Sequence, residues 1–107
     1  MKRLQLTDIA QADLKSIRRY SQRTWGSERT ERYITALRDT MKGLVAGSIL
    51  TRERDDPRPG LHMAVSGRHC IFFEENPSRI LVVRVLHDRM DFPRHLPAER
   101  TETSSDQ

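Results

Sequence analysis

The stretch "RILVVRVLHDRMD", residues 79–91, decides the fold because it joins a buried strand to a charged end. Apolar side chains occupy both alternating faces through Val85, a pattern typical of a central strand that is covered on both sides. Four ionisable side chains then follow within five positions, namely His87, Asp88, Arg89 and Asp91. The stretch therefore predicts a central strand whose end carries candidate functional residues.

Two further strands precede this one, each with a period of two. The segments "LHMAV" and "RHCIFFEE" flank Ser66 and Gly67, which are residues typical of a tight hairpin turn. The segment "NPS", residues 76–78, is the next predicted turn. The C-terminal half thus predicts three consecutive strands joined by hairpins, and such strands pair antiparallel.

The first half of the chain has a helical period instead. Thr7 is typical of a helix N-cap, Gly26 can close this first helix, and Ser27 can cap the next one. Each helix carries one apolar stripe, formed by Ala10, Leu14 and Ile17 in the first and by Ile34, Leu37, Met41, Leu44 and Val45 in the second. Because the joint between them is short, we expect an antiparallel helical hairpin.

The order of these elements predicts an α+β domain. The alternating segment at residues 2–6 adds an N-terminal strand, and the charged, proline-containing segment at residues 50–60 is expected to be a loop. We expect the N-terminal strand and the α-helical hairpin to pack on one face of a small antiparallel β-sheet. No element would remain to cover the other face, so we expect a bare apolar face that binds a partner. Residues 1–96 would form a single domain, and residues 97–107 a disordered acidic tail.

Composition limits the class of protein. The net charge is +4, and because residues 97–107 carry −2, residues 1–96 carry +6. Sixteen of the nineteen cations are arginine, which pairs bidentately with carboxylate or phosphate, so an acidic protein segment and a nucleic acid both remain open as partners. Cys70 is the single cysteine, and no stretch approaches the roughly 18 apolar residues of a membrane span. We therefore expect a cytoplasmic protein without a membrane partner.

Several motifs, taken as a set, resemble one protein family. They are Asp13-Leu14, Trp25-Gly26, Gly67-Arg68-His69, Arg84-Val85-Leu86-His87, Arg89-Met90-Asp91 and His95-Leu96. Together they resemble the ParE toxins of bacterial ParD–ParE toxin–antitoxin systems, within the RelE/ParE superfamily, over about residues 4–96. The chain departs from the family at Leu61-His62, where many members have Leu-Arg, so no arginine contact is carried over to position 62.

The resemblance implies a toxin that poisons DNA gyrase by binding, without chemistry of its own and without a cofactor. It also implies a ParD-type antitoxin, in a hetero-oligomer of two toxins with two or more antitoxins. For the gyrase contact we expect Arg84, His87, Arg89, Met90 and Asp91. For the antitoxin contact we expect Leu14, Ile17, Tyr33, Leu37, Arg68, Val83 and Val85. Sequence-specific nucleic-acid binding by the chain itself is not expected.

Two other functions remain open. A ribosome-dependent messenger-RNA endoribonuclease, as in RelE-like relatives, needs proton-transfer groups and cations around a phosphate. His69, His87 and nearby arginines could supply these, but both tyrosines fall in the predicted helical hairpin and all three lysines precede the main sheet. A homologue that only binds its antitoxin is the other alternative. The four histidines have neither paired helical spacing nor a cysteine partner, so we expect no metal site.

Overall fold

The computed structural model describes residues 2–49, 51–53, 60–90 and 94. Its elements are β1 (Arg3–Leu6), α1 (Asp8–Trp25), α2 (Ser27–Ala46), β2 (Arg52–Glu53), β3 (His62–Ser66), β4 (His69–Asn76) and β5 (Arg79–His87). The predicted order of a strand, two helices and three strands is confirmed. The two-residue strand β2 is an addition, within the segment predicted to be a loop. The tail predicted for residues 97–107 lies outside the described residues.

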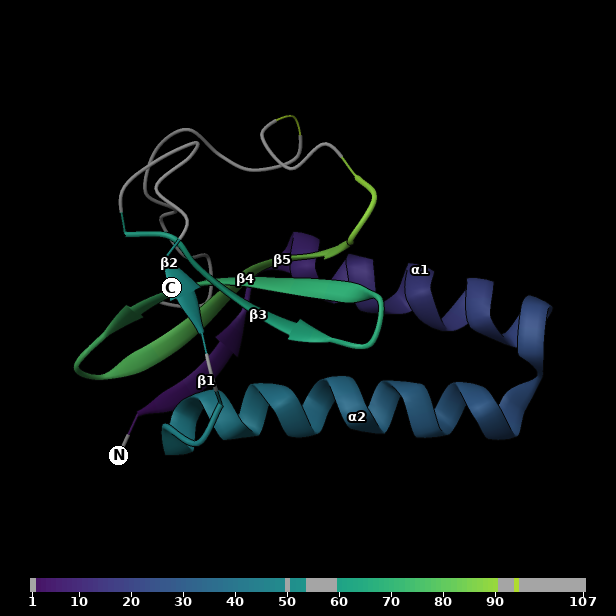
Figure 1. Ribbon diagram of the computed structural model, residues 1–107, viewed down its shortest axis with the longest axis horizontal. Helices are drawn as coiled ribbons and strands as arrows, with labels where there is room; N and C mark the ends of the chain where they lie inside the picture. The colour runs from purple at the N-terminus through teal and green to yellow at the C-terminus, as the bar shows by residue number, and fades with distance from the viewer. Residues whose placement is uncertain (1, 50, 54–59, 91–93, 95–107) are drawn as a thin grey trace.

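The five strands form one sheet in the order β1-β5-β4-β3-β2 (Figure 1). Strands β3, β4 and β5 pair antiparallel as predicted, and the additional β2 pairs antiparallel with β3. Strand β1 instead runs parallel to β5, with Arg3 opposite Arg79 and Leu6 opposite Val82. The expectation of a wholly antiparallel sheet is therefore wrong for this pair. Strand β1 leads into two helices and not into a tight turn, and only a tight turn would require antiparallel pairing.

The helical hairpin follows the predicted caps with one exception. The Ala10 N–H donates to Thr7 Oγ1 at 3.0 Å, which confirms the N-cap of α1. Gly26 ends α1 with φ of 84° and also serves as the N-cap of α2, without a side-chain bond. The prediction that Ser27 caps α2 is wrong, because a one-residue joint leaves Ser27 already inside the helix. Figure 1 shows α1 and α2 folded back beside one another, and neither helix in the described part has the length and apolar character that a bilayer crossing needs.

The sheet is buried on both faces. The helix-side core joins Ala10, Ile17, Ile34, Leu37, Met41 and Leu44 of the helices to Ala64, Ile71, Phe73, Ile80, Val82 and Val85 of the strands. A second cluster consists of Leu61, Met63, Cys70, Phe72 and Leu86. Its members are 0% to 7% exposed, so the expectation of a bare apolar face is wrong there. Strand β5 is nevertheless a central strand covered on both sides, as its apolar run predicted.

An irregularity in the β4–β5 pairing shapes the end of β5. Phe72 lies opposite Arg84, and the next residue, Phe73, lies opposite Val82, so Val83 is an extra residue on β5. Such a bulge changes which side chains share a face. Val82 and Val85 consequently both join the helix-side core although three positions separate them. The residues beyond the bulge lead directly to the candidate site.

Candidate functional site

The charged end of β5 lies in a polar cluster built from three elements. The polar cluster comprises Tyr33 of α2, Arg68 and His69 of the β3–β4 hairpin, and His87 and Asp88 at the end of β5. Strand pairing places His69 directly opposite His87, with ring centroids 5.4 Å apart. The hairpin turn itself consists of Gly67 and Arg68, one residue later than predicted, because Ser66 pairs with His69.

Tyr33 anchors the polar cluster to α2 through its hydroxyl group. Its hydroxyl lies 2.5 Å from His69 Nδ1 and accepts the Arg68 N–H at 3.0 Å. Burial lowers the pKa of His69, and the neighbouring His87 lowers that pKa further. The His69 ring is therefore neutral near pH 7. The Tyr33 hydroxyl and His69 Nδ1 share one hydrogen bond, whose donor depends on the tautomer of the His69 ring, because the hydroxyl can accept a second bond beside that from the Arg68 N–H. Burial also raises the pKa of Tyr33.

The remaining charges of the polar cluster are partly compensated within it. The Arg89 N–H donates to His87 Nδ1 at 3.1 Å, and Asp88 Oδ1 lies 3.1 Å from the same nitrogen. The other Asp88 oxygen lies 3.6 Å from Arg68 Nε. A carboxylate in this position attracts arginine and repels an approaching phosphate. No group of three or more potential metal ligands occurs among the described residues.

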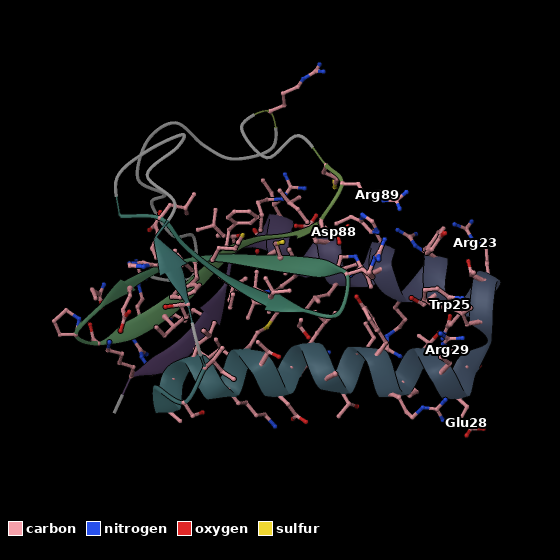
Figure 2. All side chains as sticks on the ribbon, viewed as in Figure 1. Arg23, Trp25, Glu28, Arg29, Asp88 and Arg89 are labelled. Atoms are coloured by element: carbon pink, nitrogen blue, oxygen red, sulfur yellow. The ribbon has the colours of Figure 1, made fainter. Side chains whose placement is uncertain are left out.

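The outermost side chains of the strand end face solvent. Arg89 and Met90 are exposed, Met90 by 36%, and Figure 2 shows Arg89 pointing outward beyond Asp88. Val65, on β3 and thus two strands away from β5 in the sheet, is 58% exposed. Asp91, the fifth residue predicted for gyrase contact, lies outside the described residues. Cationic, apolar and polar groups are therefore available together to a protein partner.

Arg84, also predicted for gyrase contact, makes an internal ion pair. Its Nε and Nη2 donate to the two carboxylate oxygens of Asp13 at 2.8 and 2.9 Å. The Arg84 and Asp13 side chains are only 18% and 14% exposed. The Val85 N–H adds a bond of 2.9 Å to Asp13 Oδ2. In the isolated chain, Arg84 therefore fastens α1 to β5, and its contact with gyrase stays a prediction.

A second candidate surface is a groove between β1 and the two helices. The helix–strand groove has a volume of about 610 Å³. Its apolar lining comes from Leu4, Leu6, Leu14, Ile34 and Met41. Its cationic lining comes from Lys15, Arg18, Arg38 and Lys42, and Gln5 and Gln11 complete it. An apolar lining with four cations, of which Arg18 already pairs with Glu31, suits an amphipathic segment that carries acidic side chains.

The residues predicted for antitoxin contact fall into three groups. Leu14 lines the helix–strand groove and is partly exposed. Tyr33 and Arg68 belong to the polar cluster. The remaining four, Ile17, Leu37, Val83 and Val85, are at most 9% exposed, so the isolated chain presents little of their surface. Their antitoxin contacts stay predictions.

Two features were missed in the sequence. The first is Tyr33 in the polar cluster, because its distance along the chain from the strand end gave no indication of contact. The second is the groove cations, whose signal was available. Lys15 and Arg18 are three apart, and Arg38 and Lys42 four apart, so each pair lies on one face of its helix.

Comparisons with known proteins agree with this geometry. The family model for "ParE toxin of type II toxin-antitoxin system, parDE" matches residues 4–92. The chain is 37% identical over 92 residues to Toxin ParE of Escherichia coli, across 85% of this chain and 89% of that protein. It is 35% identical over 92 residues to Toxin ParE1 of Mycobacterium tuberculosis, across 85% of this chain and 94% of that protein.

A solved structure has the same fold. It is described as the chromosomal ParDE TA system from P. aeruginosa, and it superposes with a TM-score of 0.68 at 22% identity, over 81% of this chain and 96% of that chain. The fold, the residues at the strand end and the family match point the same way: the chain belongs to the ParE toxin family of type II toxin–antitoxin systems.

Proposed function

We propose that this toxin poisons DNA gyrase by binding to it through the exposed end of β5. The observation that carries the proposal is the family match over residues 4–92, which includes the strand end. The toxin would bind the state in which gyrase holds cleaved DNA more tightly than the other states, so that breaks persist. Such an inhibitor needs only this differential affinity and no covalent step. Because gyrase acts on the chromosome, the site of action would be the cytoplasm.

The exposed groups support a docking role for the strand end. Arg89 can pair with an acidic group of the target, while the neighbouring Met90 offers apolar contact. The hydroxyl of Tyr33 and the Nδ1 atom of His69 are already bonded to each other. The cluster's proton-exchanging groups thus hold the hairpin turn in place, and the outer residues remain available for binding.

A second candidate is cleavage of messenger RNA, favoured by one observation. The structure brings Tyr33 into contact with His69, whose ring in turn lies 5.4 Å from that of His87, so a tyrosine and two histidines share one site despite their separation in sequence. Such groups can take up and deliver protons during phosphodiester cleavage. The Asp88 carboxylate beside them opposes phosphate binding, which makes this the less favoured function.

One experiment separates these functions from a homologue that only binds antitoxin. The purified chain is incubated with gyrase, ATP and supercoiled plasmid, and in parallel with ribosomes on a defined message. We expect linear DNA after protein digestion and intact message. Cut message with no linear DNA would establish the ribonuclease function instead. If neither linear DNA nor cut message is formed, gyrase poisoning is excluded and antitoxin binding is left as the function.

We further propose that a ParD-type antitoxin neutralises the toxin by laying an acidic amphipathic segment in the helix–strand groove. The apolar lining and the four surrounding cations support this choice of partner. The complex would contain two toxins with two or more antitoxins. Isothermal titration of the toxin with a ParD-type antitoxin, followed by light scattering of the complex, gives the affinity and the stoichiometry. An antitoxin without its acidic segment that still bound at full affinity would contradict this groove assignment.

A further inference from the structure

Two exposed aromatic rings, neither of them part of the polar cluster or of the helix–strand groove lining, lie at and near the joint of the helical hairpin. Tyr20 and Trp25 are 58% and 43% exposed, and their ring centroids are 6.2 Å apart at an interplanar angle of 88°. The guanidinium of Arg29 lies over the Trp25 ring, 4.9 Å from its centroid. Figure 2 shows Arg23, Trp25 and Arg29 gathered at this end of the hairpin. We call Arg19, Tyr20, Arg23, Trp25 and Arg29 the hairpin tip.

The charge of the hairpin tip is not compensated. Its two neighbouring glutamates are engaged elsewhere, Glu28 with Arg32 and Glu31 with Arg18. Arg19, Arg23 and Arg29 have no carboxylate partner within the described part of the chain. Residues 19–29 therefore carry three exposed arginines and two exposed aromatic rings, and an uncompensated cationic patch attracts a polyanion.

The aromatic rings decide which polyanion fits best. An acidic peptide would satisfy the guanidinium groups and would leave the ring faces without a matching planar group. A single-stranded nucleic acid supplies both partners, because its phosphates accept bonds from arginine and its unpaired bases stack on aromatic faces. Arginine that is stacked on an aromatic ring still points its N–H groups outward in its own plane, toward a phosphate.

We infer that the hairpin tip binds single-stranded nucleic acid without sequence preference. One base stacks on Tyr20, because Arg29 already lies over the Trp25 ring and perpendicular rings do not accept two stacked bases in succession, and the three arginines contact neighbouring phosphates. This inference does not depend on the gyrase target, because it concerns the chain alone. Three phosphate contacts imply that the logarithm of the binding constant falls with the logarithm of salt concentration with a slope of about −2.

The test uses the fluorescence of Trp25, the only tryptophan of the chain. The full chain is titrated with oligothymidylate, with an abasic oligonucleotide of equal length, and with polyglutamate of equal charge. We expect oligothymidylate to quench the fluorescence and to bind roughly tenfold more tightly than the abasic oligonucleotide, because only the former can stack. Equal binding of polyglutamate would assign the tip to an acidic protein, and binding without quenching would place the nucleic acid elsewhere. Either result overturns the inference, as does an absence of binding.

Substitutions check the location by the anisotropy of a labelled oligothymidylate. Tyr20→Ala should weaken binding roughly tenfold. Arg23→Gln should weaken it several-fold and make the salt slope less steep by about 0.7. The matched control is Arg3→Gln, another exposed arginine, on β1 at the opposite end of the molecule in Figure 1. If Arg3→Gln weakens binding as much as Arg23→Gln, the attraction is one of overall charge and the inference fails. Circular dichroism confirms that each variant is folded.

Discussion

Asp13 holds Arg84 through both of its carboxylate oxygens, and this pair ties the first helix to the last strand. The two N–O distances are 2.8 and 2.9 Å, and the same carboxylate also accepts the Val85 N–H. Both side chains are more than four-fifths buried. A partly buried charge pair of this geometry is costly to break, because the remaining charge loses its partner and is not fully hydrated.

Asp13→Asn should lower the free energy of unfolding by about 3 kcal/mol, because it leaves the Arg84 guanidinium without an opposite charge. Urea denaturation measures this change. Glu31→Gln is the matched control, since it breaks the exposed Arg18–Glu31 pair and should cost at most about 1 kcal/mol. Equal losses from the two substitutions would show that the Asp13–Arg84 pair has no special role in stability.

Gly67→Ala should disturb the polar cluster through a direct clash. A Cβ at this position would lie 2.7 Å from Tyr33 Cε1, and the backbone φ is +59°. Gly47→Ala is the control for backbone strain alone, because Gly47 has φ of +74° and no atom within 4 Å of its added Cβ. We expect Gly67→Ala to cost roughly 1 kcal/mol more than Gly47→Ala in chemical denaturation. If Gly67→Ala costs no more unfolding free energy than Gly47→Ala, then Tyr33 does not pack against the turn.

Stability should fall as the pH is lowered from about 6.5. The lowered pKa of His69 means that the unfolded chain takes up this proton first, so the folded state loses stability through that window. The groups acting on His69 are His87, which opposes protonation, and Asp88 and Asp13, which favour it. Melting temperatures at pH 7.5 and 5.5 measure the effect. His69→Asn should reduce the difference between them, and an unchanged difference would exclude His69 as its source.

Charge reversal in the helix–strand groove should weaken antitoxin binding. Lys15→Glu combined with Lys42→Glu places two negative charges beside the apolar lining, where we propose that an acidic segment binds. We expect the dissociation constant to rise at least about tenfold, and the loss to be smaller at high salt. Arg3→Glu, outside the groove, is the control and should change the affinity much less. An unaffected double variant would place the antitoxin elsewhere.

The sequence was sufficient for elements whose signal is local. The Thr7 cap, the Gly26 that ends the first helix and the apolar run of β5 each depend on neighbouring residues, and each appears as predicted. Contacts between residues distant in sequence were harder to predict. The parallel pairing of β1 with β5 depends on where two helices return the chain, which no local pattern records.

The candidate site shows the same division. The charged end of β5 is evident from residues 87–91, but its contact with Tyr33 depends on how α2 packs against the β3–β4 turn. Burial of Phe72 and Leu86 on the second face was also not predictable, because counting regular elements left nothing to cover that face. The helix–strand groove was not predictable either, because its lining residues come from β1 and both helices, which only the folded structure brings together.

The central claim is that gyrase is engaged by the exposed end of β5, and a DNA-cleavage assay with gyrase and plasmid tests it most directly. Arg89→Ala combined with Met90→Ala removes exposed side chains, so the melting temperature should stay nearly unchanged. We predict that this variant requires at least about tenfold more protein than the unmodified chain to yield the same amount of linear DNA, as expected when binding anchors are lost. Equal yields of linear DNA at equal concentrations would contradict the account.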